Sequence, residues 1–458
     1  MLPRPDSLIS KAVHAELTDW RRWWTRIVIL AAAAAAGLLV VGLARAVEWA
    51  LHRFLHLFAS HGGLALLWVP CCTAAVVALT RRFAPGAAGS GIPQVMAALD
   101  PSMPAPRQSL LVGLRLSLWK TVLTTAGMFG GLSLGREGPS VQIAAGVMHA
   151  ARRLLPQGTE IRPQGLLVAG GAAGIAAAFN TPLGGVMFAI EELSRTPEQR
   201  NSGLLIGAIV LAGLLAVSIE GNSPYFGVIH VPDVGSALLW PGAIVTLLSG
   251  LAGGLFARLL IASLTGGGHE RSTAWQGRHP LLFAAACGLG TALIGGSLHG
   301  ATFGSGYEQT RAMLADESTL PWLYLPLKFI ATWLTTWSGV PAGIFAPSLS
   351  IGGAIGHDVA HLLGDPNIGA LMAIGMAGFL AAVTQAPLTA FIIVMEMVDG
   401  HAMVLSLMAA SVVASGIARL VTPPLYGTLA QAQLARWRPL PEAETDASAE
   451  KKEPSRAP

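Results

Sequence analysis

One charged pair, Arg136 and Glu137, stands between two glycines in the middle of apolar sequence. The flanking stretches, residues 128–134 and 141–147, contain no charged side chain. A charged side chain at membrane depth is costly and usually faces a partner, a cavity or an ion path. A carboxylate in such a place can carry a proton or compete with a free anion. These two kinds of chemistry are the ones that the pair suggests.

The residues after the pair predict where the carboxylate lies. Pro139 indicates the first turn of a helix, because its fixed backbone suits that position. Glu137 is therefore expected at the N-terminus of that helix, where unpaired N–H groups and the positive end of the helix dipole lie. Helix N-termini bind anions. We expect the Glu137 carboxylate to act as a tethered anion that a free anion can replace.

The composition predicts a membrane protein. Of the 458 residues, 53% are hydrophobic and 12% are charged, whereas soluble domains have roughly 25% charged residues. Uncharged runs recur along the chain and reach or nearly reach the roughly 17–25 residues that a spanning helix needs. Several are interrupted by Gly and Pro, which is typical of broken helices buried in protein. We predict an all-α, multi-pass membrane protein made of tilted and broken helices.

Basic residues predict its orientation in the bilayer. Arg and Lys gather in 4–26 and 195–200 and near the C-terminus, so both termini are expected in the cytoplasm. No basic stretch is long enough or backed by a soluble domain to indicate nucleic-acid binding. The expected parts are an interfacial N-terminal helix at 1–24, a membrane domain at 25–436 and a disordered cytoplasmic tail at 437–458.

The membrane domain contains an internal repeat. Lys120 stands 15 residues before Gly135, and Lys328 stands 15 residues before Gly343. In both halves a Pro-Ser pair begins four residues after that glycine, and later Ala-Gly, Pro-Leu and Glu positions also match. Such coincidences are uncommon in apolar sequence, and they predict two homologous halves. The halves span about residues 25–218 and 235–432.

Some polar residues are shared by the halves, which favours a role in the scaffold. Glu191 and Glu396 occupy equivalent positions, and capping or pairing would explain both. Lys120 and Lys328 are also equivalent. Two interpretations of the lysines stay open: they raise the potential for an anion, or they neutralise the two glutamates.

Other acids have no counterpart. At the position of Glu137 the second half has Phe345, and at the position of Glu192 it has Met397. The scaffold therefore does not require these two carboxylates. Glu137 and Glu192 are the acids that we expect to carry function.

Three short stretches resemble the signatures of the CLC family of chloride channels and transporters. They are Gly-Ser-Gly-Ile-Pro at 89–93, Gly-Arg-Glu-Gly-Pro at 135–139 and Gly-Ile-Phe-Ala-Pro at 343–347, in the order and spacing of that family. The similarity includes the Glu191–Glu192 pair and Pro-Leu-Tyr at 424–426, and it covers residues 23–435.

The resemblance implies a homodimer with one anion pathway in each subunit and with inverted halves. It also implies that the hydroxyls of Ser90 and Tyr426 bind a dehydrated anion, together with the backbone N–H groups of Ile344 and Phe345. Gly138, beside the carboxylate, belongs to the same candidate set.

The resemblance further implies roles for the two acids. A glutamate at the position of Glu137 is the gate and outer proton carrier of the family. One at the position of Glu192 accepts protons on the cytoplasmic side in the exchangers and is usually apolar in the channels. A serine at the position of Ser90 accompanies chloride, whereas nitrate-selective relatives tend to have proline there.

Together these features favour a proton-coupled chloride antiporter in a cell membrane, the inner membrane if the host is bacterial. Its expected partners are chloride, protons, lipid and a second copy of the chain, with no cofactor and no metal. The alternative is a passive, voltage- or pH-gated chloride channel with the same anion site. An intramembrane enzyme that uses Glu137 and Glu192 as acid and base lacks a nucleophile or metal constellation, so we do not expect an enzyme. The four histidines considered for a metal site form no ligand constellation and are interpreted as packing or surface groups: His149, His357, His361 and His401.

Overall fold

The computed structural model describes residues 19–159, 161–194, 202–221, 225–227, 238–266, 270–315 and 320–437. Three expected features lie wholly or mostly outside these ranges: the N-terminal helix before residue 19, the basic cluster at 195–200 and the tail after residue 437. The expected domain boundary at residues 24 and 25 falls inside one long helix, which begins at Trp20.

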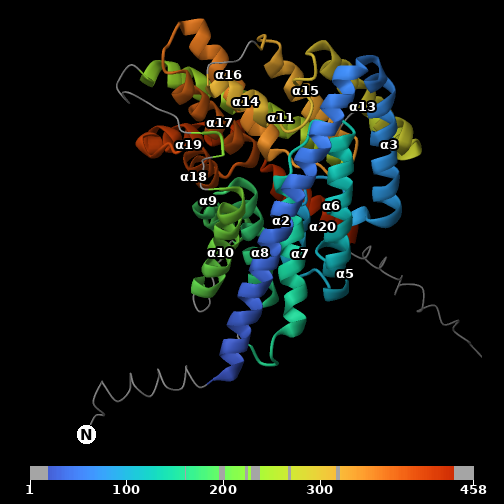
Figure 1. The fold of residues 1–458 in the computed structure, drawn as a ribbon, viewed down its shortest axis with the longest axis vertical. Helices are drawn as coiled ribbons and strands as arrows, with labels where there is room; N and C mark the ends of the chain where they lie inside the picture. Colours follow the sequence, from blue (N-terminus) through green and yellow to red (C-terminus); the bar gives the residue numbers. More distant parts are fainter. Residues whose placement is uncertain are drawn as a thin grey trace, which may run out of the picture.

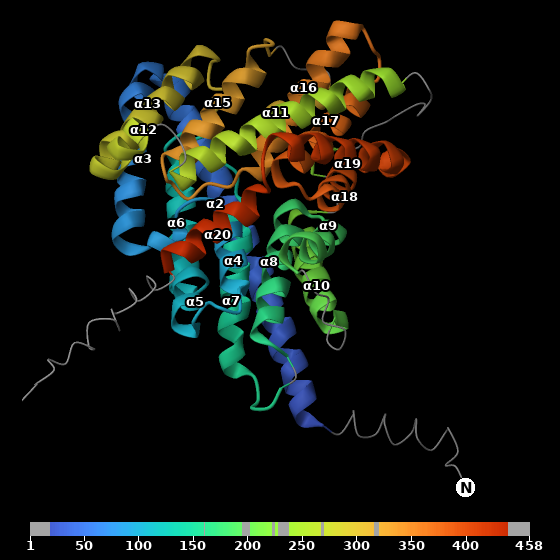
Figure 2. The same cartoon turned by 180° about the vertical axis from the view of Figure 1, so that it is seen from behind.

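The described residues form helices joined by short connections (Figures 1 and 2). The helices of the first half are α2 (Trp20–Ser60), α3 (Ala65–Phe83), α4 (Ile92–Leu99), α5 (Ala105–Leu111), α6 (Leu114–Phe129), α7 (Glu137–Ala151), α8 (Pro163–Phe179), α9 (Pro182–Phe188) and α10 (Ser202–Glu220). Those of the second half are α11 (Leu239–Thr265), α12 (Glu270–Arg278), α13 (Pro280–Ser297), α14 (Tyr307–Leu314), α15 (Tyr324–Trp337), α16 (Phe345–Leu363), α17 (Ile368–Thr384), α18 (Pro387–Met397), α19 (Val404–Val421) and α20 (Leu425–Trp437). The all-α prediction is confirmed.

Six helices of the described part are long and apolar enough to cross a membrane. Other apolar runs are divided into two shorter helices, as the sequence predicts. Asn180 caps the C-terminal end of α8 and Gln385 caps that of α17. Both residues adopt the left-handed conformation, with φ of 60° and 59°. Pro182 and Pro387 then begin α9 and α18. A left-handed residue ends a helix and a proline fits the start of the next one, so the same break is built into both halves.

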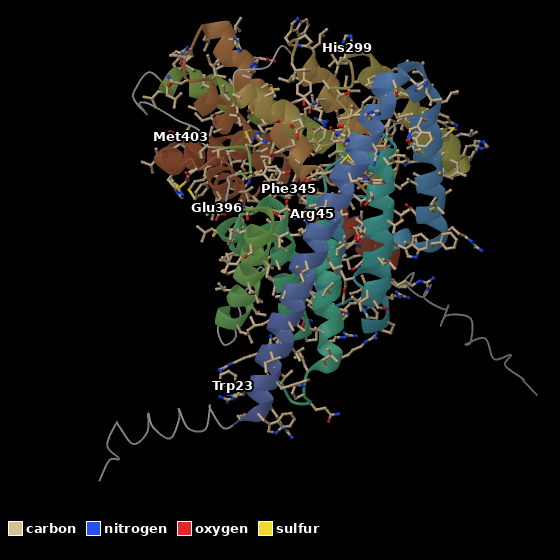
Figure 3. The ribbon with its side chains drawn as sticks, in the orientation of Figure 1. Trp23, Arg45, His299, Phe345, Glu396 and Met403 are labelled. Atoms are coloured by element: carbon tan, nitrogen blue, oxygen red, sulfur yellow. The ribbon has the colours of Figure 1, made fainter. Side chains whose placement is uncertain are left out.

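The two halves are inverted relative to each other. α7 runs from the middle of the molecule to its lower end, and α16 runs from the middle to its upper end (Figures 1 and 2). Phe345, the first residue of α16, lies between Trp23 at one end and His299 at the other (Figure 3). Both helices are buried along most of their length, and their Gly and Ala residues allow neighbouring helices to pack closely.

The two shared glutamates, Glu191 and Glu396, connect the halves through hydrogen bonds. Glu191 accepts hydrogen bonds from the backbone N–H groups of Leu388 and Thr389, at 3.1 and 2.6 Å, at the start of α18. Glu396 accepts those of the two residues after Pro182, at 3.2 and 2.7 Å, at the start of α9. Each carboxylate therefore satisfies unpaired donors of a helix that belongs to the other half. The scaffold role expected for this pair is confirmed.

Loss of one of these caps is expected to destabilise the fold. Glu191→Gln and Glu396→Gln each replace a charged acceptor of two N–H groups with an amide that has one acceptor oxygen. Because a hydrogen bond to a charged group contributes about 1.5–3 kcal/mol, each change should lower the free energy of unfolding by about that amount. Thermal unfolding in detergent measures this effect, with the exposed Glu308→Gln as the control. Unchanged unfolding of both cap variants would contradict the role.

Candidate functional site

Glu137 is the first residue of α7 and is fully buried. One carboxylate oxygen, Oε2, accepts a hydrogen bond from the backbone N–H of Ala346, in the first turn of α16, at 3.4 Å. The other, Oε1, has no hydrogen-bond partner among the described residues. A methyl group at Gly135 would collide with Oε2, so this glycine makes space for the carboxylate. The carboxylate thus lies where two helix N-termini meet, as the position of Pro139 predicts.

A backbone bridge fixes the two helix starts against each other. Gly135 N–H donates to Gly343 C=O at 2.8 Å, and Gly343 N–H donates to Gly135 C=O at 3.0 Å. The two glycines are equivalent in the repeat, so the bridge joins the halves through matching residues. Because the dipoles of α7 and α16 both direct their positive ends here, the junction favours a negative charge.

Ser90 approaches the junction from a third helix start, that of α4. It stands between Gly89 and Gly91, which have φ of 73° and 108°. The Ser90 hydroxyl is buried and packs so closely on Gly138 that a methyl group there would collide with it. It makes no capping hydrogen bond, since the residue that caps α4 is Gly91. A serine just before a helix is a common N-cap, and from the sequence we expect Ser90 both to cap α4 and to donate to an anion. The capping part of that expectation is wrong.

Tyr426 completes the junction from the first turn of α20. It is 1% exposed, and its ring stacks on Phe345 with 6.1 Å between the ring centres and 14° between the planes. Its hydroxyl lies close to that of Ser90, and neither hydroxyl has a hydrogen-bond partner of good geometry among the described residues. Two buried hydroxyls without partners among the described residues are unusual, because a buried polar group normally has one. Their arrangement provides donors for an anion between them.

The structure therefore brings the predicted anion-binding residues together. Ile344 and Phe345 begin α16, and Phe345 stacks on Tyr426. Gly138 supports the Ser90 hydroxyl. All of them lie near the Glu137 carboxylate, which also acts electrostatically on the Tyr426 hydroxyl.

Two buried lysines hold equivalent turns of the two halves, and the turn held by Lys120 leads into Ser90. Lys120 Nζ donates to the carbonyl oxygens of Ala87 and Gly89, at 2.7 and 2.6 Å. Lys328 makes the same pair of bonds in the loop before α14, at 3.0 and 2.8 Å. The interpretation that the lysines neutralise the two repeat glutamates is wrong, because backbone N–H groups occupy those carboxylates. Within the described residues, the lysines instead satisfy carbonyl groups at two matching turns.

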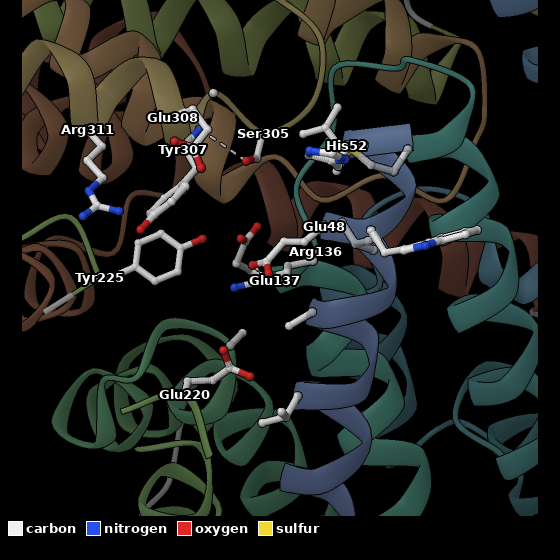
Figure 4. A pocket seen from close by; sticks show the side chains of 18 of the residues that line it. Glu48, His52, Arg136, Glu137, Glu220, Tyr225, Ser305, Tyr307, Glu308 and Arg311 are labelled. Atoms are coloured by element: carbon white, nitrogen blue, oxygen red, sulfur yellow. Dashed lines mark hydrogen bonds and ion pairs between the residues drawn. The ribbon is translucent and has the colours of Figure 1, made fainter. Parts of the chain in front are cut away.

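A cavity of about 890 Å³ opens on one side of Glu137. Arg136 lies in its wall and pairs with Glu48 of α2 at 2.6 Å, so Arg136 is directed away from the neighbouring carboxylate. The Tyr225 ring lies 5.9 Å from the Arg136 guanidinium, and its hydroxyl points toward Arg136 and Glu137 (Figure 4). We call this the outer cavity. Its lining contains both polar and apolar side chains and includes residues 41–56 of α2, so it lies away from the N-terminal end of that helix.

A second cavity, of about 1110 Å³, lies on the other side of the junction. Glu192 lines it, in a five-residue π-helical turn at Ala189–Leu193 that follows α9. We call this the inner cavity. The charges of Glu192 and Glu137 both act on the Tyr426 hydroxyl. A structural alternative for Glu192 is an ion pair with Arg195, three residues later on a helix, but Arg195 lies outside the described residues.

Sequence reasoning missed several residues of the site. Glu48 lies shortly after the first apolar run, and nothing in the sequence connects it with Arg136. Tyr225 belongs to the connection between the halves. Gly304-Ser305-Gly306 matches the stretch around Ser90 and precedes α14 as that stretch precedes α4. The identical tripeptide was a usable signal. The match is not found at a constant spacing, because Gly89 is 31 residues before Lys120, whereas Gly304 is 24 residues before Lys328.

Known proteins resemble this chain over most of its length. The sequence profile of the family described as "Voltage gated chloride channel" matches residues 72–419. The chain is 30% identical over 429 residues to the "H(+)/Cl(-) exchange transporter ClcA" of Citrobacter koseri, covering 87% of this chain and 86% of that protein. It has the same identity, over 427 residues, to the protein of that name from Salmonella typhimurium, again covering 87% and 86%.

Solved structures give the same result for the fold. The chain resembles a slow cyanobacterial Cl⁻/H⁺ antiporter with a TM-score of 0.78 and 27% identity, covering 90% of this chain and 98% of that one. It resembles a CLC-type fluoride/proton antiporter with a TM-score of 0.70 and 21% identity, covering 90% and 99%. The second likeness concerns the fold alone.

Proposed function

Because this chain belongs to the CLC family of voltage-gated chloride channels and their transporter relatives, we propose that it is an antiporter that exchanges chloride for protons across a membrane. One observation carries the proposal. The Glu137 carboxylate is buried where the N-termini of α7 and α16 meet, next to two buried hydroxyls and between two cavities. A carboxylate that occupies an anion site can couple anion movement to its own protonation.

The proposed cycle follows from competition for that site. When Glu137 is deprotonated, its charge is stabilised by the helix N-termini and it excludes chloride. Protonation removes the charge, so the side chain moves into the outer cavity and chloride binds. There chloride accepts hydrogen bonds from the Ser90 and Tyr426 hydroxyls and from the N–H groups of Ile344 and Phe345. When Glu137 loses its proton and returns, it displaces the anion.

Glu192 is proposed to supply protons from the other side. It lines the inner cavity, from which a carboxylate can exchange protons with water. Transfer to Glu137 then passes the Tyr426 region through water. A proton route separate from the anion ligands distinguishes an exchanger from a channel, because a channel with the same anion site needs no inner carboxylate.

The proposed assembly is a homodimer in a cell membrane, the inner membrane in a bacterial host, with both termini in the cytoplasm. The curated relatives named above are exchange transporters, which supports transport rather than enzymatic catalysis. The inner cavity then faces the cytoplasm and the outer cavity faces the opposite side.

The test uses the purified chain in sealed liposomes. An outward chloride gradient should drive protons inward against their own gradient, which a pH electrode records. A protonophore should release the accumulated protons. Chloride efflux without any proton uptake would overturn the exchanger proposal and leave the channel.

Selectivity provides a second test. Ser90→Pro removes the hydroxyl and the N–H group of residue 90, and a lost hydrogen bond to a charged ligand is worth about 1.5–3 kcal/mol. Because a smaller anion depends more on close contacts, we expect chloride to lose at least about tenfold in affinity relative to nitrate. Competition by nitrate against labelled chloride uptake measures the ratio. Ser305→Pro, in the matching tripeptide, is the control, and an unchanged ratio in Ser90→Pro would exclude Ser90 as a ligand.

A further inference from the structure

Two histidines contact each other near the end of α16 that is opposite Phe345. His357 and His361 are four residues apart, so their side chains lie on one face, about one turn from each other. Their Nε2 atoms are 3.1 Å apart and their ring centres 4.3 Å apart. His357 is buried, whereas His361 is exposed. The pair is separate from the anion site and has no part in the proposed transport cycle.

The separation of the two nitrogens suits a metal ion. Zinc–imidazole bonds are about 2.0–2.1 Å long, so two of them at angles of about 90–110° hold their nitrogens about 2.8–3.4 Å apart. The observed 3.1 Å falls within that range. A metal ion can therefore bind both rings with little rearrangement of the helix.

A neighbouring carboxylate favours the form of His357 that binds metal. Asp358 Oδ1 lies 3.3 Å from His357 Nδ1. An ionised carboxylate only accepts hydrogen bonds, so it places the ring proton on Nδ1 and leaves the lone pair of Nε2 directed toward His361. A carboxylate behind a metal-binding histidine orients the ring and raises its basicity. The C-terminal end of α16 also favours a positive charge, because the negative end of the helix dipole lies there.

We propose that His357 and His361 form a binding site for a divalent transition-metal ion such as Zn²⁺. Among the described residues, no group of three or more His, Cys, Asp or Glu side chains could hold such an ion. The site thus has two protein ligands, and water occupies the remaining positions. The metal links two successive turns at the end of α16 and stabilises that end of the helix.

Titration of the purified, tag-free chain with Zn²⁺ in a calorimeter tests the proposal. We expect one site per chain, which His361→Asn removes because a single imidazole remains. Asp358→Asn should weaken the same site by about tenfold, as expected for loss of the carboxylate behind the ligand. Zn²⁺ should also raise the unfolding temperature of the wild-type chain but not that of His361→Asn, because a ligand stabilises only the state that binds it.

His401→Asn is the matched control. His401 lies 3.4 Å from Asp399, so it also has a neighbouring carboxylate, but among the described residues no hydrogen bond joins it to a second histidine. Its replacement should leave Zn²⁺ binding unchanged. Since His361 is exposed, His361→Asn should fold, and chloride flux equal to that of the wild type confirms this. Equal Zn²⁺ binding by His361→Asn and the wild type, or no binding by the wild type, would overturn the proposal.

Discussion

Glu137→Gln is expected to abolish proton movement while chloride flux continues. Glutamine has nearly the same shape as glutamate, but it has no charge to compete with chloride and no proton to carry at any pH. Since the carboxylate is fully buried at the meeting point of two helix N-termini, its negative charge is the property that excludes an anion. In liposomes, proton uptake driven by chloride should fall to the level of protein-free vesicles.

The pH dependence should change in the same variant. In the wild type, acidification protonates Glu137 and releases the site, so chloride flux should rise as the pH falls. In Glu137→Gln no charged carboxylate competes for the anion site at any pH, so the chloride flux should stay nearly constant with pH. Glu308 lines the same outer cavity, and Glu308→Gln is the control that should retain coupled transport. A Glu137→Gln variant that still moves protons against their gradient would show that this carboxylate is not the carrier.

Much of this site could be predicted because charged residues and prolines are unusual within long apolar stretches. A charge between glycines, followed by a proline that suits a first helical turn, located the N-terminus of α7 and the buried carboxylate on it. The repeat then separated Glu191, which has a counterpart and caps a helix, from Glu137, which has none. These inferences use local backbone chemistry and a comparison within the chain, so they need no knowledge of long-range packing.

The partners of charged residues could not be predicted in the same way. Arg136 pairs with Glu48, which is 88 residues earlier in the chain, and no periodicity connects the two. Lys120 bonds to backbone carbonyls, and such groups exist at every residue, so the sequence does not mark the ones that are used. Ser90 does not cap α4, because Gly91 holds the N-cap position and the Ser90 hydroxyl packs against Gly138 of α7.

The geometry also explains why the site needs both halves. The Glu137 carboxylate belongs to α7, but its backbone donor belongs to α16. The bridge between Gly135 and Gly343 holds these helix starts together. Because each half provides one helix N-terminus, neither half alone could form the junction. The inverted repeat is thus the reason that two helix N-termini meet at the Glu137 carboxylate.

Glu192→Gln is expected to abolish proton transport and to leave chloride binding nearly unchanged. Glutamine keeps the size and the hydrogen-bonding groups of the side chain but removes the proton that it exchanges. The proposed hydroxyl and N–H ligands lie at the starts of α4, α16 and α20, whereas Glu192 belongs to the π-helical turn after α9. Chloride affinity, measured by calorimetry, should therefore match that of the wild type. Proton uptake in liposomes should fall to background.

The comparison with Glu137→Gln makes this result specific. Both variants should lose proton transport, but only Glu137→Gln should lose the competition between carboxylate and chloride. Chloride flux through Glu192→Gln should therefore still rise with acidification from the outer side, where Glu137 is protonated. Asp100 lines the same inner cavity, and Asp100→Asn is the control that should retain coupling. If Glu192→Gln transports protons at the wild-type rate, protons reach Glu137 by another route. In that case the difference between Glu192 and its repeat counterpart Met397 does not mark a proton acceptor.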